Sequence, residues 1–263
     1  MSASATESRS FWKPQWLSDL GDFSRFTMIS LLGLFEKPLR WTNLIDEIEF
    51  VGNQSLFIIC LTSLFTGAVL AYQAWLALSI VGTQSLVGVS TALALLRELS
   101  PVMASIVVAG RVGAAMAAKI GIMRVTSQID ALELMAISPK QYLVTPKIWA
   151  SIISVPILCS VFSLIGNVGA YIVGVLICNI DGGIYIEKVK SYIAPWDLYH
   201  GLIKALIFGL LIAAISCYKG YNAKNGAEGV GKATNESVVA SIVVIIVLDY
   251  FLSVLIPTGR NVF

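Results

Sequence analysis

The sequence predicts an all-α integral membrane protein with N-terminal interfacial helices, five transmembrane helices and a cytoplasmic helix between the second and third of them. The 263 residues are 57% hydrophobic and only 13% charged, with a mean hydropathy of +0.81. A soluble domain of this size does not show that balance. A bilayer core about 30 Å thick requires roughly 20 apolar residues per helix, and five runs reach that length. Lys and Arg are concentrated in alternate connections between these runs.

The chain before the first long apolar run divides into two parts. Residues 1–10 are small and polar and are expected to form a disordered tail. They do not resemble a signal peptide, since no compact apolar stretch with a cleavage site follows. In residues 11–52 charges interrupt the apolar positions every few residues, which is typical of helices lying in the membrane interface, with Trp12, Trp16 and Trp41 as headgroup anchors. A small cytosolic helical cap is the alternative.

Residues 53–263 are predicted to form the membrane domain. The five runs give spans at about 55–81, 87–118, 148–180, 198–218 and 238–257. The second and third are longer than a perpendicular crossing needs and contain Pro101 and Pro156, so we expect tilt or a kink there.

The distribution of Lys and Arg predicts the orientation. Twelve of them lie before the first span, between the second and third spans, or between the fourth and fifth. Only Lys188, Lys190 and Arg260 lie on the other side. Because short cytoplasmic connections carry the excess of positive charge, the N-terminus is expected in the cytoplasm and the C-terminus outside.

Ionisable residues inside the predicted spans are the main candidates for function. We single out Arg97 and Glu98 in the second span, Lys204 in the fourth and Asp249 in the fifth. An unpaired charge near the bilayer centre costs about 2.5–3.5 kcal/mol on insertion scales, so such residues usually face a protein interior. Helical rise places all four in one layer in the middle or outer half of the membrane. Pairs of Glu98 with Lys204 and of Arg97 with Asp249 are expected. They either join helices or surround a cavity for a polar headgroup.

Small residues and one helix face complete the membrane domain. The runs Ala109, Gly110, Gly113, Ala114, Ala115, Ala117, Ala118 and Gly166, Gly169, Ala170, Gly174 predict close helix packing. On the first span Leu70, Ala74 and Leu78 share a face beside Gln73. That face either lines an acyl-chain cavity or packs against the protein.

The connection from Lys119 to Lys140 is too polar to span, yet Ile122, Val125, Ile129, Leu132 and Ala136 recur at helical spacing. An amphipathic helix at the cytoplasmic face is predicted. Asp130 and Glu133 lie one turn apart there, which in a soluble protein suggests acid/base catalysis. Solvated carboxylates, or carboxylates docked against a partner, are the favoured interpretation.

Several motifs are excluded as sites. Gly226 to Ala233 matches the phosphate-loop pattern except at the final hydroxyl, and it lies between two spans instead of between a strand and a helix. It is expected to be a flexible turn, with Thr234 or Asn235 capping the fifth span. His200 is the only histidine and is expected at the interface, without a chemical role. The four cysteines have no metal or disulfide spacing and are interpreted as small buried hydrophobes. No catalytic residue, metal site or cofactor is predicted, and the net charge of +2 does not favour a nucleic-acid partner.

The stretch from Leu95 to Ile148, LLRELSPVMASIVVAGRVGAAMAAKIGIMRVTSQIDALELMAISPKQYLVTPKI, resembles the signature region of the MlaE family of ABC transporter permeases. Later pieces fit the same pattern, so the resemblance covers about residues 52–257: Lys204 to Phe208, Gly220 to Tyr221, Asn235 to Val238 and Leu248 to Asp249.

The resemblance implies a permease of the bacterial inner membrane, associated with outer-membrane lipid asymmetry. It implies a second copy of the chain, a cytoplasmic ATPase dimer that holds ATP and Mg²⁺, a ring of MCE proteins on the outer face, and phospholipid in a cavity between the two copies. By matching positions, Arg97, Glu98, Lys204 and Asp249 border that cavity. Arg124, Gln128, Asp130 and Glu133 belong to the coupling helix that docks on the ATPase. The loop at residues 219–232 has no role implied.

Two other classes of function remain open from the residues alone. A membrane-embedded lipid-modifying enzyme would use Glu98 or Asp249 as a general base, although no histidine or metal cluster stands beside them in the sequence. A passive scaffold would use the four charges only to hold helices together.

Overall fold

A computed structural model describes residues 15–33, 41–224 and 226–256. These residues form helices and short connections, without a strand, and five of the helical segments are long and apolar enough to cross a membrane. The all-α membrane fold is therefore confirmed. The expected tail at residues 1–10, Trp12 and the end of the fifth span at Pro257 lie outside the described residues, as do the side chains of residues 15–20.

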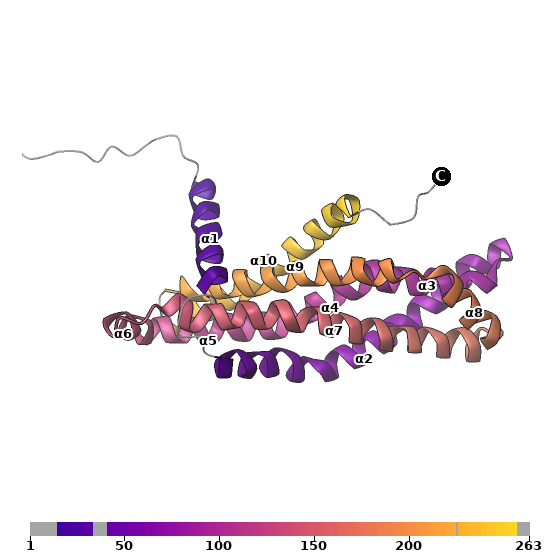
Figure 1. The fold of residues 1–263 in the computed structure, drawn as a ribbon, viewed down its shortest axis with the longest axis horizontal. Coiled ribbons are helices and arrows are strands. Elements are labelled where there is room, and N and C mark those ends of the chain that lie inside the picture. The colour runs from indigo at the N-terminus through magenta and orange to yellow at the C-terminus, as the bar shows by residue number, and fades with distance from the viewer. Residues whose placement is uncertain (1–14, 34–40, 225, 257–263) are drawn as a thin grey trace, which may run out of the picture.

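The first two helices differ from the expected pair of interfacial helices. α1 (Gln15–Leu32) runs roughly perpendicular to the long axis of the bundle and projects from it near the end that carries α6 (Gln128–Leu134), which suits a helix in the plane of the interface (Figure 1). α2 (Trp41–Val81) is one helix of 41 residues, about 60 Å long at 1.5 Å per residue. Residues 41–52 therefore extend the first span beyond the hydrocarbon core, because nothing in that stretch breaks the helix.

The second crossing is one helical path from η2 (Gln84–Leu86) to α5 (Ala114–Val125). Its parts are α3 (Val87–Ala94), η3 (Leu95–Leu99), α4 (Ser100–Val108) and η4 (Ala109–Gly113). η3 and η4 are π-helical, and η3 ends two residues before Pro101. Because proline has no amide hydrogen, the helix cannot keep its ordinary hydrogen-bond ladder across Pro101. The expected distortion takes the form of this π-helical segment.

The remaining crossings are longer than the hydropathy runs. The elements are η5 (Lys140–Val144), α7 (Thr145–Ile172), η6 (Val173–Ile177), α8 (Gly182–Tyr192), α9 (Pro195–Tyr221) and α10 (Gly226–Leu255). The prediction of a flexible glycine turn and a capped helix start at Thr234 or Asn235 was wrong. Residues 226–237 form the first turns of α10, because only Gly226 adopts a positive φ there and the other glycines accept helical angles.

Close backbone contact holds α2 against α7, as the small residues predict. A Cβ atom at Gly67 would overlap the carbonyl oxygen of Gly166, and one at Gly169 would overlap that of Leu64. Gly113 and Gly220 fill similar positions between α9 and the second crossing, whereas a Cβ at Gly110 would meet no atom within 4 Å. Packing at these distances compensates for the absence of a hydrophobic driving force between helices in lipid.

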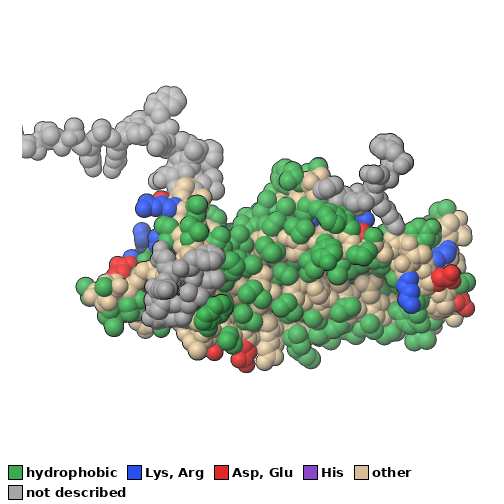
Figure 2. All heavy atoms as spheres, in the orientation of Figure 1, with side chains coloured by type: hydrophobic (Ala, Val, Ile, Leu, Met, Phe, Trp, Pro, Cys, Tyr) green, Lys and Arg blue, Asp and Glu red, His purple; other side chains and the backbone are tan. Residues whose placement is uncertain are grey.

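The bundle has an apolar middle and two polar ends. Hydrophobic side chains cover most of the middle on the face in Figure 2, while charged groups gather toward the ends. α6 lies at one end and α8 at the other (Figure 1). The four cysteines are free, as expected, but only Cys159, Cys178 and Cys217 are buried, and Cys60 is half-buried on α2.

Candidate functional site

The charged residues predicted inside the membrane converge from three helical segments. Lys204 on α9 donates from Nζ to Glu98 Oε2 at 2.5 Å and to Asp249 Oδ1 on α10 at 3.0 Å. It also donates to Ser253 Oγ at 2.7 Å. Ser253 in turn lies 3.0 Å from Glu98 Oε2. All three ammonium hydrogens of Lys204 therefore have acceptors, which a cation in low dielectric requires.

Exposure differs sharply within this cluster. The Lys204 side chain is fully buried, whereas 44% of the Glu98 side chain and 20% of the Asp249 side chain are exposed. η3 supplies Glu98, and its π-helical turn is closed by the Ser100 amide donating to the Leu95 carbonyl. π-helical turns inside α-helices occur frequently at functional sites. The cluster thus presents carboxylates outward around an enclosed cation.

The expected pairing of Arg97 with Asp249 was wrong. Arg97 donates from Nε and Nη2 to Asp197 Oδ1, at 2.7 and 2.5 Å. The other Asp197 oxygen accepts from the Ala194 amide at 2.9 Å. Asp249 is held by Lys204 instead, and the layer therefore contains three carboxylates and two cations. Asp197 escaped the sequence analysis because it lies one residue before the predicted fourth span, at the edge of its hydropathy run.

Two further polar residues lie on the helical segments that carry these charges, His200 close to Lys204 and Arg111 about 20 Å further along the second crossing than Glu98. Arg111 also falls inside the predicted second span, so the same cost of an unpaired charge in a membrane applies to it. The structure places it in η4, with its Nη2 3.5 Å from Gln54 Oε1. His200 was expected at the interface but is only 2% exposed. α9 begins at Pro195, before the hydropathy run, so His200 lies within its packed part, one turn before Lys204.

The helix face predicted on the first span divides between two environments. Leu70 and Gln73 line a cavity of about 380 Å³ together with Phe65, Val69 and Leu99. Leu99 follows Glu98 directly, so this cavity adjoins the charged layer. Ala74 and Leu78 lie further along α2 and pack against a separate outer cluster that includes Val87 and Tyr185.

The residues predicted at the cytoplasmic face occupy a bend and not one continuous amphipathic helix. α5 ends at Val125, and α6 begins at Gln128 after Ser127 adopts a φ of 57°. Ser127 cannot continue a right-handed helix in that conformation. Of the five periodic positions only Ile129 is buried, and Ile122 and Val125 belong to α5 and are exposed.

Contacts across the bend join three of the four predicted coupling residues. Arg124 Nη1 donates to Asp130 Oδ1 at 2.7 Å. The Arg124 guanidinium lies 5.5 Å from the centre of the Tyr221 ring, and Tyr221 Oη donates to Glu133 Oε1 at 3.3 Å. Gln128 is exposed at the start of α6. These contacts fix α6 against the end of α9.

A second buried ion pair lies near the same end of the bundle. Lys147 at the start of α7 donates to Glu47 Oε1 on α2, and Lys119 on α5 lies 3.6 Å from the same oxygen. The Lys147 side chain is 3% exposed and that of Glu47 is 14% exposed. This cluster connects α2, α5 and α7, and sequence analysis counted its two lysines only as cytoplasmic charges.

Comparison with known proteins places the chain in a family. The family model described as Permease MlaE matches residues 44–255. A probable ABC transporter permease protein of Rickettsia bellii is 40% identical over 234 residues, covering 89% of this chain and 90% of the relative. The intermembrane phospholipid transport system permease protein MlaE of Haemophilus influenzae is 36% identical over 225 residues, covering 85% and 86%.

A plant protein shows the same similarity over part of its length. The chloroplastic protein TRIGALACTOSYLDIACYLGLYCEROL 1 of Arabidopsis thaliana is 35% identical over 223 residues, which are 85% of this chain and 64% of the relative. Apart from the first three residues of α2, the region matched by the family model covers the five helical segments long enough to cross a membrane, together with the charged layer. The chain therefore belongs to the MlaE family of permeases.

Proposed function

We propose that the chain is the permease subunit of an ATP-driven phospholipid transporter, in which two copies enclose a lipid cavity and pass lipid between the inner membrane and a tunnel of MCE proteins. The observation that carries the proposal is the intramembrane charged layer, in which Lys204 is buried while Glu98 and Asp249 are partly exposed. The phospholipid transport named for the Haemophilus influenzae relative supports the choice of cargo.

The charged layer and the cavity beside it suit the two parts of a phospholipid. Partly exposed side chains of both signs, Glu98, Asp249 and Arg97, offer partners for a polar headgroup. The cavity at Leu70, Gln73 and Leu99 is mostly apolar and adjoins that layer, so acyl chains extend into it. Leu78, which was expected on the same face, packs in the outer cluster with Val87 and Tyr185 and does not line this cavity.

A second copy of the chain explains how carboxylates remain exposed inside a membrane. Glu98 would be costly against hydrocarbon, so the face that carries it must be covered by protein or line a polar cavity. The end of α10 angles away from the other helices (Figure 1), and Ser253 near that end lies 3.0 Å from Glu98 Oε2. The apolar side chains of that end, including Tyr250, Phe251 and Val254, are more than half exposed. The same face on a second copy would complete a two-fold symmetric interface.

The end with α6 is proposed to dock on a cytoplasmic ATPase dimer, which holds ATP and Mg²⁺. Leu134 is 90% exposed and Met135 is 68% exposed at the end of α6, beside Arg124, Gln128, Asp130 and Glu133. Exposed apolar residues outside the spans are typical of a protein interface. The excess of Lys and Arg at this end supports a cytoplasmic N-terminus and a periplasmic C-terminus. MCE proteins would cover the opposite end, at α8.

The proposed mechanism is alternating cavity geometry. ATP binding at the partner closes the two permease copies through α6, and the narrowed cavity exchanges its lipid with the MCE tunnel. A ligand follows such a change only if its affinity differs between the two states. The charged layer supplies that difference, because closure changes how far Glu98 and Asp249 can reach a headgroup.

The test is mass spectrometry of what copurifies when the chain is expressed with its neighbouring genes, followed by reconstitution into vesicles. We expect phospholipid, a separate ATPase and an MCE protein, and ATP-dependent transfer of fluorescent phospholipid. A chain that folds alone, without lipid or partners, would contradict the proposal. Turnover of lipid by the isolated chain would favour the enzyme instead.

A further inference from the structure

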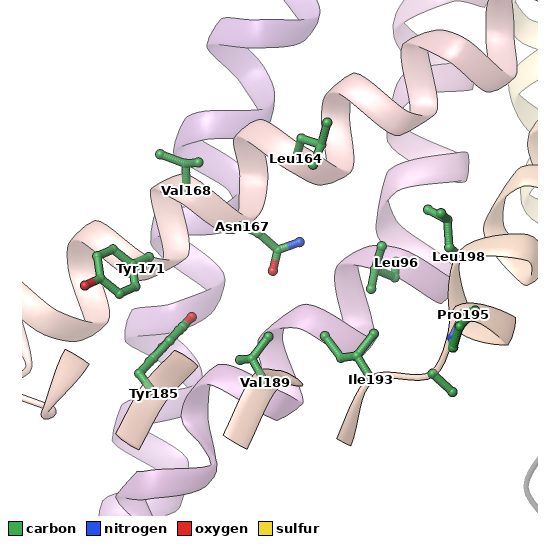
Figure 3. Close-up of a pocket in the computed structure, with 11 residues that line it drawn as sticks. Leu96, Leu164, Asn167, Val168, Tyr171, Tyr185, Val189, Ile193, Pro195 and Leu198 are labelled. Carbon is green, nitrogen blue, oxygen red and sulfur yellow. The ribbon is translucent and has the colours of Figure 1, made fainter. Parts of the chain in front are cut away.

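A second cavity lies outside the charged layer and is unassigned by the proposed function. It has a volume of about 650 Å³, within the roughly 300–1,000 Å³ of small-molecule sites. α7, α8, the start of α9 and Leu96 of η3 form its walls (Figure 3). Apart from Asn167 and two tyrosine hydroxyls, the side chains that line it are hydrocarbon, among them Leu96, Leu164, Val168 and Leu198.

The cavity opens to the surface that faces lipid. Leu164 is 70% exposed and Val168 is 54% exposed on α7, and Leu198 is 41% exposed on α9. Leu164, Val168 and Tyr171 share one face of α7, and they span about 10 Å at 1.5 Å per residue. The medium that touches this groove in a bilayer is therefore acyl chain.

One polar group in the groove has no partner. Tyr185 is only 5% exposed, and its buried hydroxyl accepts and donates no hydrogen bond within the described residues. In Figure 3 this hydroxyl points across the groove toward α7. Burial, followed by the neighbouring Tyr171, raises the pKa of Tyr185 to about 12, so its proton is retained and the hydroxyl is a donor. A buried donor without an acceptor is unfavourable.

The Tyr185 ring cannot turn to find another partner. A Cβ atom at Gly88 would come within 2.9 Å of the ring, and one at Gly174 within 3.1 Å. The ring of Tyr171 packs edge-on at 5.5 Å. The two glycines therefore form a slot that fixes the ring and aims its hydroxyl into the groove.

We propose that this groove binds one ester-linked acyl chain of a membrane glycerophospholipid, whose ester carbonyl accepts a hydrogen bond from Tyr185. α8 connects two crossings at the end of the bundle opposite α6 (Figure 1), which is the level of the interfacial region where ester groups lie. A transmembrane helix of a partner is a poorer occupant, since its backbone carbonyls already accept hydrogen bonds within that helix. An ester carbonyl is free to accept.

The site is tested with the full chain and its copurifying partners in phospholipid vesicles, without ATP. The probe is a trace of phosphatidylglycerol that carries a photoactivatable diazirine on one acyl chain. After illumination, peptide mass spectrometry should find the label concentrated in residues 164–171 and 185–198. Val168→Trp, which fills the groove, should lower that labelling at least fivefold.

The matched control is Ile157→Trp, because Ile157 lies on the same helix and is 55% exposed, against 54% for Val168. It should leave the labelling unchanged. Label spread evenly over the exposed face of α7, unaffected by Val168→Trp, would overturn the proposal. Crosslinks from these residues to a partner protein in place of lipid would overturn it as well.

Tyr185→Phe separates the hydrogen bond from the shape of the groove and preserves the ring packing. Loss of one hydrogen bond weakens binding by about fivefold. The wild-type chain should therefore label about fivefold less with a dialkyl ether analogue of the probe than with the diester, while Tyr185→Phe should label equally with both. Equal labelling of the wild-type chain would overturn the ester contact. Transport plays no part in this readout, so a failure of the proposed transport function would leave it intact.

Discussion

Two buried lysines hold helices together in this protein, and the surroundings of their carboxylates differ. Lys147 near α6 is paired with Glu47, which is itself 14% exposed and has a second cation, Lys119, 3.6 Å away. Lys204 in the middle of the bundle serves two carboxylates, and 44% of the Glu98 side chain remains exposed. The first cluster has an enclosed carboxylate and one cation more than it has carboxylates. The second, which we call the open cluster, has partly exposed carboxylates and one carboxylate more than it has cations.

The difference indicates different roles. The Lys147 cluster connects α2, α5 and α7, and its only carboxylate, Glu47, is 14% exposed, so it offers a ligand little access; its one strongly exposed member is Lys119, whose side chain is 64% exposed. A pair whose carboxylates are exposed inside a membrane is costly unless another polar group meets it. We therefore expect the Lys147 cluster to act on stability alone and the Lys204 cluster to act on both stability and transport.

The largest effect on stability is expected for Lys204→Met. This change leaves Glu98 and Asp249 facing each other without their shared cation, and breaking a buried ion pair from one side costs about 3–5 kcal/mol. Adding Glu98→Gln and Asp249→Asn should restore most of the loss, because no charge then remains unpaired. Unfolding in a detergent titration measures both steps. A loss below about 1 kcal/mol for the single change would show that the cluster does not hold the helices.

A second large effect concerns the contact between α2 and α7, the two helices that the Glu47–Lys147 pair also joins. Gly67→Ala should destabilise by about 3 kcal/mol, since the new methyl group would overlap the Gly166 carbonyl. Gly52→Ala on the same helix is the control: its Cβ meets no atom within 4 Å, and alanine favours a helix over glycine by about 1 kcal/mol. Equal effects at both positions would contradict the close packing.

An intermediate effect is expected for Lys147→Met. Glu47 loses its buried partner but keeps Lys119 within reach, so the cost should be about 2 kcal/mol, below that of Lys204→Met. The same detergent titration compares the two lysines directly. If Lys147→Met lowered the free energy of unfolding as much as Lys204→Met, the additional cation Lys119 would not compensate for the lost lysine. The proposed difference between the two clusters would then be wrong.

The smallest effect on stability is expected at the bend before α6. Arg124 and Asp130 are 37% and 53% exposed, and exposed ion pairs contribute at most about 1 kcal/mol. Arg124→Ala should therefore leave the melting temperature nearly unchanged while lowering ATP-driven transport severalfold, because α6 loses its anchor. The control is Lys219→Ala, which removes a similarly exposed pair with Glu236 at the same end. Equal transport by both variants would exclude a coupling role for Arg124.

Much of this architecture could be predicted from local signals. The five crossings follow from hydropathy and length, and the close approach of α2 to α7 follows from the glycines. Glu98 with Lys204 could be predicted because intramembrane charges at one depth must find partners. The pairing of Arg97 with Asp197 could not be predicted in this way, because Asp197 lies outside the hydropathy run. It comes within hydrogen-bond distance of Arg97 only because α9 already starts at Pro195.

The other differences arise where tertiary structure overrides a local pattern. Glycines at residues 226–231 suggest a turn, yet the helix that crosses the membrane as α10 already starts at Gly226. The periodic positions from Ile122 to Ala136 suggest one helix, yet Ser127 breaks it. The groove at Tyr185 has no sequence signature, because its walls come from segments about 100 residues apart, Leu96 and Leu198 among them.

The central claim is that the open cluster around Lys204 binds the lipid during transport. The most direct test compares two fully neutral variants in reconstituted vesicles: Glu98→Gln, Lys204→Met and Asp249→Asn together, against Glu47→Gln with Lys147→Met. Neither variant leaves a buried charge without a counter-ion, because Lys119, which remains charged in the second, is exposed. Both variants should therefore fold and assemble. We predict that the first lowers ATP-driven phospholipid transfer at least tenfold and that the second transfers lipid within twofold of the wild-type rate. Full transfer by the first variant would contradict the claim.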